Sequence, residues 1–263
     1  MSVIFLHKTL DTTSYSGVAL TTTPTSFAST YPSTNLQDQY YNTVTTTNAT
    51  TLNQEWRINL GATYACDSAL FLNHNFTSVA ADVGIKLQHA DDSGYSTNLV
   101  TDDDDVTTAD GASSYTTFSS ATKRYWRLYF NSTVPLGVIP YIGQIFLGTK
   151  FTHAYNYTIG NTEETGYEIL KQRAWDGTDS AYLQYSTKRK FWGSVRFQII
   201  TSDYKTNFDT FFESIKGGYR PFMMSTDSGT TWYYVRVAED KIQYINKGAN
   251  YWETTLNFYE QIT

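Results

Sequence analysis

Apolar residues recur at every second position in several short runs of this chain, most clearly at 56–60, 83–88 and 124–130. Successive side chains of a β-strand point to opposite faces, so this period predicts strands with one buried face. The sequence contains 22 Tyr, 15 Phe and 6 Trp among 263 residues, and aromatic residues favour strands. The chain is therefore predicted to be mainly β, with an aromatic-rich core.

One segment, residues 203–216, follows a helical period instead. Its apolar side chains share one face of the predicted helix: Tyr204, Phe208, Phe211, Phe212 and Ile215. Ser202 can cap the first turn, and Gly217 and Gly218 can adopt the left-handed backbone that ends a helix. Because strands are predicted on both sides of this helix, the second half is expected to be a β-rich, split-barrel-like unit with one amphipathic helix.

A change from apolar strands to a polar stretch at Thr149 predicts a domain boundary there. A chain of 263 residues is long enough for two domains with separate cores. We expect one unit at 1–148, beginning with an extended segment, and a second at 149–263. Within the first unit, the strand at 56–60 is expected to end at Gly61.

Charge and motif content argue against several classes of function. The net charge is −6 and the isoelectric point about 5.2, whereas a nucleic-acid surface needs clustered Lys and Arg. No apolar run approaches the roughly 20 residues of a membrane span, and the first residues do not resemble a secretory leader. The chain also lacks a Gly-X-Ser-X-Gly elbow and a Gly-rich phosphate loop. We therefore expect no enzymatic activity, no nucleotide cofactor, no nucleic-acid partner and no membrane span.

Five segments of the first half form a recognisable set: residues 31–36 with Asp38, 56–61, 71–75, 85–88 and 123–128. Together they resemble the discoidin-like, galactose-binding-like domains of phage and bacterial surface proteins. The resemblance extends over residues 25–148. It implies a jelly-roll β-sandwich.

The second half contains another such set: residues 191–193, the helix at 208–216, residues 217–222 and the closing strand at 251–256. In these segments it is similar to the tail-tube-type or distal-tail-type domains of long-tailed phages. Such domains pack into a ring around the tail axis. The resemblance implies that ring assembly involves this unit, with these residues as candidates: Phe191, Trp192, Arg220, Pro221 and Phe222.

Candidate ligand-facing residues are a histidine and several loop tyrosines. His74 ends an apolar run and could present its imidazole to a ligand, or it could be a histidine at the edge of the core. Sugars stack on exposed aromatic faces, which Tyr40, Tyr41, Tyr95 and Tyr115 could offer from loops of a sandwich. Each of these rings could equally belong to the core.

No resident cofactor is expected, and only a structural calcium ion is left open. The run from Asp102 to Asp105 could supply carboxylate oxygens to calcium, or form a solvated acidic loop. Discoidin-like domains often hold calcium in a loop near their start, where Asp38 is the acidic residue that the resemblance offers. No Cys or His neighbours another at zinc-ligand spacing.

Together these features lead to one main hypothesis and one alternative. The main hypothesis is a structural protein of a phage tail tip or baseplate, which forms a hexameric or trimeric ring through its C-terminal unit and displays the sandwich outward. Its partners would be copies of itself and tail-tube, hub and fibre proteins, and it would reside in the virion after synthesis in the host cytoplasm. The alternative is a monomeric carbohydrate-binding module for host-surface glycans. An enzyme acting on surface polysaccharide is a third class, without support from a motif.

Overall fold

The computed structural model describes residues 2–7, 19–23, 44–46, 54–79, 84–106, 113–134, 136–153, 162–167, 169–173, 179–183, 188–199 and 201–261. The chain divides into two compact units. Lys8–Lys150 form the first, called the sandwich unit here. Met1–His7 and Phe151–Ile262 form the second, called the C-terminal unit.

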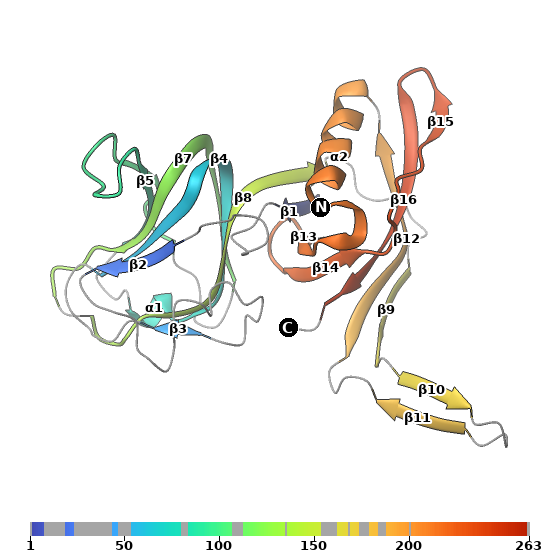
Figure 1. The fold of residues 1–263 in the computed structure, drawn as a ribbon, viewed down its shortest axis with the longest axis horizontal. Helices are drawn as coiled ribbons and strands as arrows, with labels where there is room; N and C mark the ends of the chain where they lie inside the picture. Colours follow the sequence, from blue (N-terminus) through green and yellow to red (C-terminus); the bar gives the residue numbers. More distant parts are fainter. Residues whose placement is uncertain are drawn as a thin grey trace. The chain divides into compact units, whose positions relative to one another are not determined.

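In its described residues, the sandwich unit contains strands and one short helix (Figure 1). Its elements are β2 (Ala19–Thr23), β3 (Thr45–Thr46), β4 (Glu55–His74), α1 (Phe76–Val79), β5 (Ile85–Ala90), β6 (Val100–Asp103), β7 (Ser114–Phe130) and β8 (Tyr141–His153). The strand order is β6-β5-β7-β4-β8, with β2 beside β4 and β3 beside β8. All of the assigned strand pairs in this unit are antiparallel.

The two longest strands, β4 and β7, contribute to both layers of the sandwich. The first part of β4 pairs with β2 and the last part of β7, and after a register shift between Asn59 and Tyr64 the remainder pairs with β8 and the first part of β7. Gly61 has a φ of 77°, a backbone conformation that glycine adopts readily. The prediction that the strand ends at Gly61 is therefore wrong, because the chain bends there and continues as a strand.

The core of the sandwich unit confirms the period-two alternation. Trp56, Ile58 and Leu60 from β4 and Trp126, Leu128 and Phe130 from β7 are each at most 1% exposed. They belong to one apolar cluster with residues of the other layer, including Phe71, Ile145 and Leu147. The residues between them, such as Arg57 and Arg127, point away from this core. The predicted fold class is confirmed: the protein is mainly β, with a β-sandwich and one amphipathic helix.

The C-terminal unit is a strand-and-helix unit with one main sheet. Its elements are β1 (Val3–His7), β9 (Thr162–Gly166), β10 (Ile169–Arg173), β11 (Asp179–Leu183), β12 (Arg189–Ile199), α2 (Ser202–Ser214), the 3-10 turn η2 (Gly217–Tyr219), β13 (Phe222–Ser225), β14 (Tyr233–Val237), β15 (Ile245–Gly248) and β16 (Tyr251–Glu260). The strand order is β1-β13-β14-β16-β12-β9, with β15 beside β16, and β10 and β11 form a separate hairpin.

The first strand of the chain belongs to this second unit, which corrects the predicted boundaries of 1–148. Ile4, Phe5 and Leu6 of β1 pair with β13, more than 200 positions later. Phe5 is completely buried and packs against Phe151, Phe197, Phe211, Phe222 and Phe258, with ring centroids between 4.8 and 6.1 Å away. The apolar run at the N-terminus thus completes a core built from distant phenylalanines.

The predicted helix is present with small shifts at both ends. Thr201, not Ser202, is the N-cap, and its hydroxyl accepts a hydrogen bond from the Tyr204 backbone N–H at 3.1 Å. The left-handed stop lies at Lys216 and Gly217, with φ values of 50° and 63°. A Cβ on Gly218 would lie 2.4 Å from the Val237 carbonyl oxygen, so Gly218 is needed for close packing. No helix in the described parts of the chain is both long and apolar enough to cross a membrane.

Candidate functional site

His74 lies at the end of β4 and is completely buried. Its ring stacks on Phe76 with centroids 4.2 Å apart, and its Nδ1 accepts a hydrogen bond from the Phe76 backbone N–H at 3.4 Å. The ligand-facing prediction for His74 is therefore wrong. The structure supports the alternative, a histidine that belongs to the edge of the core.

Tyr95 is also closed to ligands, because only 6% of it is exposed. The guanidinium carbons of Arg57 and Arg127 lie 5.3 and 4.8 Å from its ring centroid, and its hydroxyl donates to the Trp126 carbonyl. Burial, above all, raises the pKa of Tyr95, and the Glu55 carboxylate raises it further. As a sugar platform, Tyr95 is a wrong prediction.

Of the remaining predicted tyrosines, Tyr115 lies in the part of the chain that the structure describes. Tyr115 is half-buried, and burial followed by the charge of Asp67 raises its pKa to about 12. Tyr40 and Tyr41 lie outside the described residues, as does Asp38. For these positions the sequence-based expectation stays a prediction.

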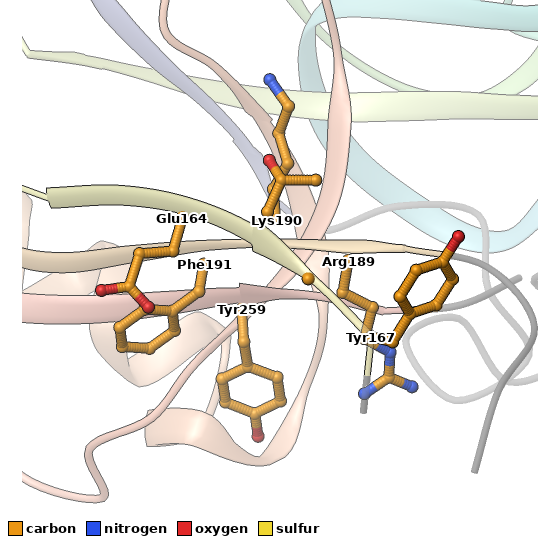
Figure 2. A pocket seen from close by; sticks show the side chains of 8 residues that line it. Glu164, Tyr167, Arg189, Lys190, Phe191 and Tyr259 are labelled. Carbon is orange, nitrogen blue, oxygen red and sulfur yellow. The ribbon is translucent and has the colours of Figure 1, made fainter. Parts of the chain in front are cut away.

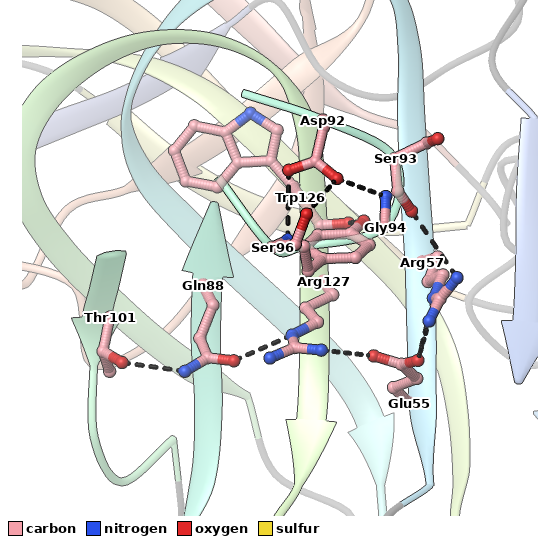
Figure 3. Close-up of polar contacts among 11 residues, drawn as sticks. Glu55, Arg57, Gln88, Asp92, Ser93, Gly94, Ser96, Thr101, Trp126 and Arg127 are labelled. Carbon is pink, nitrogen blue, oxygen red and sulfur yellow. Dashed lines mark hydrogen bonds and ion pairs between the residues drawn. The ribbon is translucent and has the colours of Figure 1, made fainter. Parts of the chain in front are cut away.

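A chain of hydrogen bonds crosses the outer face of the sandwich from β4 to β6, and we call its five residues the Glu55 clasp (Figure 3). Glu55 accepts from Arg57 Nε and Arg127 Nη1, both at 2.8 Å. Arg127 Nε donates to Gln88 Oε1, and Gln88 Nε2 donates to Thr101 Oγ1, again at 2.8 Å. Glu55 and Gln88 are only 5% and 6% exposed, whereas Arg57 and Arg127 are half-buried and Thr101 is exposed, so the clasp has a buried middle with paired polar groups and an exposed end.

The loop after β5 lies over part of this clasp and is fastened by one carboxylate. Asp92 accepts hydrogen bonds from the backbone N–H groups of Gly94, Ser96 and Thr97, as Figure 3 shows in part. These bonds lower the pKa of Asp92, with the Thr97 N–H as the largest cause. The loop also places the Tyr95 ring against Arg57 and Arg127. This part of the Glu55 clasp is therefore covered by the chain itself and closed to a ligand.

The acidic run does not gather its carboxylates around one point. Asp102 Oδ2 lies 2.7 Å from His89 Nδ1, Asp103 accepts from the backbone N–H of Asp105, and Asp104 faces Lys86 at 3.8 Å. Burial raises the pKa of Asp102, while the His89 hydrogen bond acts in the opposite direction. Within the described ranges, no three His, Cys, Asp or Glu side chains are arranged to hold a metal ion.

The ring-assembly candidates separate into core and surface residues. Trp192 and Phe222 are 1% and 0% exposed and belong to the core, so they cannot form a surface for another subunit. Arg220 and Pro221 are half-buried. Phe191 is 38% exposed, and it lines a cavity on the other side of the sheet from that core.

This cavity, which we call the β12 cavity, has a volume of about 420 Å³ and lies on the outer face of β9, β12 and β16 (Figure 2). Its described lining residues are Glu164, Thr165, Gly166, Tyr167, Arg189, Lys190, Phe191 and Tyr259. Glu164, Phe191 and Tyr259 are directly opposite one another on the three strands, and Gly166 is opposite Arg189. Residues in such register lie on the same face of a sheet.

Two glycines shape the cavity. A Cβ on Gly193 would lie 3.1 Å from Phe191 Cε1 and 2.6 Å from Thr162 Oγ1, so the Phe191 ring extends along β12 into space that a side chain would need. A Cβ on Gly166, in contrast, would meet no atom within 4 Å. Gly193 therefore makes room for the Phe191 ring, and Gly166 leaves open space beside Arg189.

The polar groups of the cavity lie at opposite ends. Figure 2 shows the Glu164 carboxylate beside Phe191, the Arg189 guanidinium beside Tyr167, and Tyr259 between the two pairs. Lys190 points to the opposite side, where it donates to Glu163 at 2.8 Å and to the Tyr233 hydroxyl at 2.9 Å. The Glu163 hydrogen bond is the main reason that the pKa of Lys190 is raised.

The β12 cavity offers groups that can bind a ligand. Glu164 is the single carboxylate among its described lining residues. Three aromatic rings, one hydrogen-bond acceptor and one guanidinium can hold a ligand with apolar faces and a polar rim. Sequence reasoning assigned Phe191 to ring assembly and missed Glu164, Tyr167, Arg189 and Tyr259. The alternation along β12, with Arg189 and Phe191 on the face opposite Trp192, was the signal that could have found part of the site.

No protein-family model and no curated protein matches this chain. Among solved structures, similar ones include chitosan-binding module 1 of a chitosanase/glucanase from Paenibacillus sp. IK-5, at 19% identity over 50% of this chain and 94% of that one, with a TM-score of 0.41. Another is CpGH89CBM32-5 from Clostridium perfringens in complex with GalNAc-β-1,3-galactose, at 15% identity over 50% and 95% of the two chains and a TM-score of 0.41. The lectin-binding domain of lectinolysin, complexed with Lewis b in a His 62 mutant, has 15% identity, coverages of 50% and 91%, and a TM-score of 0.38. These structural neighbours are carbohydrate-binding modules or domains, and at such low similarity they carry no information on the function of this chain.

Proposed function

We propose that this protein is a non-catalytic carbohydrate-binding protein and that the β12 cavity is its sugar site. The observation that carries this proposal is the grouping of three aromatic rings, from Tyr167, Phe191 and Tyr259, around a cavity that also holds Glu164 and Arg189. A pyranose has apolar C–H faces and a rim of hydroxyl groups. The rings match the faces, and the charged groups match the rim.

The size and exposure of the β12 cavity agree with this role. A volume of about 420 Å³ lies within the range of about 300–1,000 Å³ found for small-ligand sites. Phe191 and Tyr167 are 38% and 49% exposed, so both rings are accessible from solvent. Glu164 is exposed in the cavity lining, and its ionised carboxylate can accept hydrogen bonds from ligand hydroxyls.

The proposed glycan site lies in the C-terminal unit, whereas the sequence predicts one in the sandwich unit. In the sandwich, the described outer face is occupied by the Glu55 clasp and its covering loop, and His74 and Tyr95 are buried. Glycan recognition by other loops of the sandwich stays a separate prediction, with Tyr40, Tyr41 and Tyr115 as its candidate residues. The same binding experiment tests it.

Tail-tip assembly in a virion also stays a prediction. Neither a ring nor a tail partner is represented among the structural neighbours described above, and two of the five ring candidates are core residues. Carbohydrate binding does not depend on it, because the β12 cavity lies within one chain. Detection of this chain in purified virions by mass spectrometry would test it, and its absence from the particles would end that hypothesis.

The test of the proposed function is a glycan-array screen with the full chain, followed by calorimetry on the best ligand. Phe191→Ala is expected to weaken binding about thirtyfold, since a buried aromatic anchor contributes about 2 kcal/mol. Tyr219→Ala is the matched control, because Tyr219 is 73% exposed and lies outside the cavity. It should bind as the unmodified protein does. Absence of glycan binding, or full binding by Phe191→Ala, would refute a sugar site in the β12 cavity.

A further inference from the structure

Gly166 leaves a space in the β12 cavity that no backbone requirement explains. It is the last residue of β9 and lies directly opposite Arg189 of β12. Its φ is not among the positive values that favour glycine, and an added Cβ would meet nothing within 4 Å. A Cβ could be accommodated at this position without a clash, and a side chain there would extend into the space beside Arg189.

The residues around this space determine which chemical group it can take. Directly opposite residues have Cβ positions about 5 Å apart, so the surface over Gly166 lies next to the base of the Arg189 side chain. The guanidinium beside Tyr167 offers hydrogen-bond donors and no acceptor (Figure 2). The Lys188 ammonium lies 5.5 Å from the centroid of the Tyr167 ring and adds a second positive charge at this end. A group that enters here must accept hydrogen bonds, and it gains most if it is an anion.

The opposite end of the cavity has the reverse preference. Glu164 can only accept hydrogen bonds while it is ionised, so it requires donors such as sugar hydroxyls. A ligand that satisfies both ends carries hydroxyls at one end and an acceptor at the other. A carboxylate matches the planar guanidinium best, because the two can form a pair of parallel hydrogen bonds.

We propose that the β12 cavity selects acidic sugars of the uronate class, and that Gly166 is the specificity-determining position because its missing side chain admits the sugar carboxylate to Arg189. This inference rests on the proposed function. It adds the chemical class of the sugar and the residue that selects it.

The experiment compares three oligosaccharides on the full chain: an oligogalacturonate, its fully methyl-esterified form, and a chito-oligosaccharide of equal length. The ester keeps the skeleton of the acid and removes its charge, and the chito-oligosaccharide offers a neutral acetamido carbonyl as the acceptor. The acid should bind at least tenfold more tightly than the ester at low salt, since a hydrogen bond to a charged group contributes about 1.5–3 kcal/mol. Its advantage should shrink as salt screens the charges.

Three variants locate the selection. Gly166→Val should abolish the preference for the acid, and Gly166→Ala should reduce it while changing the cavity least. Gly137→Val is the matched control, because a Cβ on Gly137 also meets nothing within 4 Å and this residue lies in the sandwich unit. It should leave binding unchanged. Thermal unfolding of each variant checks that the fold is intact.

The possible results separate this inference from the proposed function. Loss of the acid preference in Gly166→Val, with an unchanged melting temperature, supports the inference. Equal binding of acid and ester, tighter binding of the chito-oligosaccharide, or an acid preference that survives Gly166→Val overturns it and leaves sugar binding itself intact. If the unmodified protein binds no oligosaccharide at all, both proposals fail.

Discussion

The Glu55 clasp and the β12 cavity are built from the same kinds of residue on the outer faces of two sheets. Each combines a glutamate, an arginine on a central strand and neighbouring tyrosines. In the clasp, Glu55 meets two arginines, and Arg127 lies 4.8 and 4.5 Å from the rings of Tyr95 and Tyr129. In the β12 cavity, Glu164 stays exposed and Gly166 leaves a space open.

The difference shows that residue type alone does not mark a binding site. A charged group whose partners lie within the chain is committed to those partners, and its removal destabilises the fold because they stay buried without a counter-charge. A charged group that stays exposed in a concave surface has its interaction energy available for a ligand. We therefore expect substitutions in the Glu55 clasp to change stability, and substitutions in the β12 cavity to change ligand binding.

The largest expected effect is on the free energy of unfolding, from the same substitution in the two clusters. Glu55→Ala should destabilise the protein by about 3–5 kcal/mol, because it leaves Arg57 and Arg127 partly buried without their carboxylate. Glu164→Ala should change it by no more than about 0.5 kcal/mol, as is usual for an exposed residue. Urea unfolding followed by tryptophan fluorescence measures both. Equal losses of unfolding free energy in Glu55→Ala and Glu164→Ala would show that the two glutamates contribute equally to stability.

A second, somewhat smaller effect should follow from the buried histidines of the two units. In the sandwich, His89 lies beside a carboxylate, Asp102, that can balance an imidazolium. In the C-terminal unit, His153 is completely buried and hydrogen-bonded to the neutral Tyr204 hydroxyl, and burial lowers its pKa from 6.5 to about 4. The unfolded chain therefore binds this proton more readily, so stability falls as the pH drops below 6.5. The loss should reach about 3 kcal/mol below pH 4.

Hydrogen exchange read by mass spectrometry at pH 7 and pH 5 can separate the two units. Peptides from α2 and β12 should lose protection at pH 5. His153→Gln keeps a hydrogen-bonding side chain that does not titrate, and it should remove the difference. A pH response that persists in this variant would assign the effect to other groups.

The smallest expected effect concerns ligand affinity and not stability. Glu164→Gln keeps the shape of the side chain and removes its charge, so sugar binding should weaken by about 1.5 kcal/mol, or roughly tenfold. Calorimetry with the best glycan measures this change. The matching substitution Glu55→Gln should leave the affinity unchanged, provided that the protein is still folded at the assay temperature. A loss of affinity in Glu55→Gln alone would place the sugar site in the sandwich unit.

Much of the fold could be predicted from local patterns. The alternation around Trp56 and Trp126 identified strands and their buried faces, and the period from Tyr204 to Ile215 identified α2. The end of a strand at Gly61 was predicted wrongly, because a glycine can bend a strand without ending it. The candidate site was largely missed. From the sequence, Phe191 is predicted to take part in ring assembly and not in a cavity. Glu164 and Tyr259 lie 27 and 68 positions away from Phe191 in the sequence. A pattern of spacing over a few residues cannot show that residues so far apart are neighbours.

The sequence by itself determined which segments are strands or helix and which side chains of each segment are apolar, because these properties depend on spacing over a few residues. Only the tertiary structure decided which strands are neighbours and in which register. That pairing placed β1 against β13, closed the arginines of the sandwich under a loop, and brought Glu164, Phe191 and Tyr259 into one row. The physical reason is that pairing is selected by the burial of distant apolar residues in a common core, an energy that belongs to the whole fold and to no single segment.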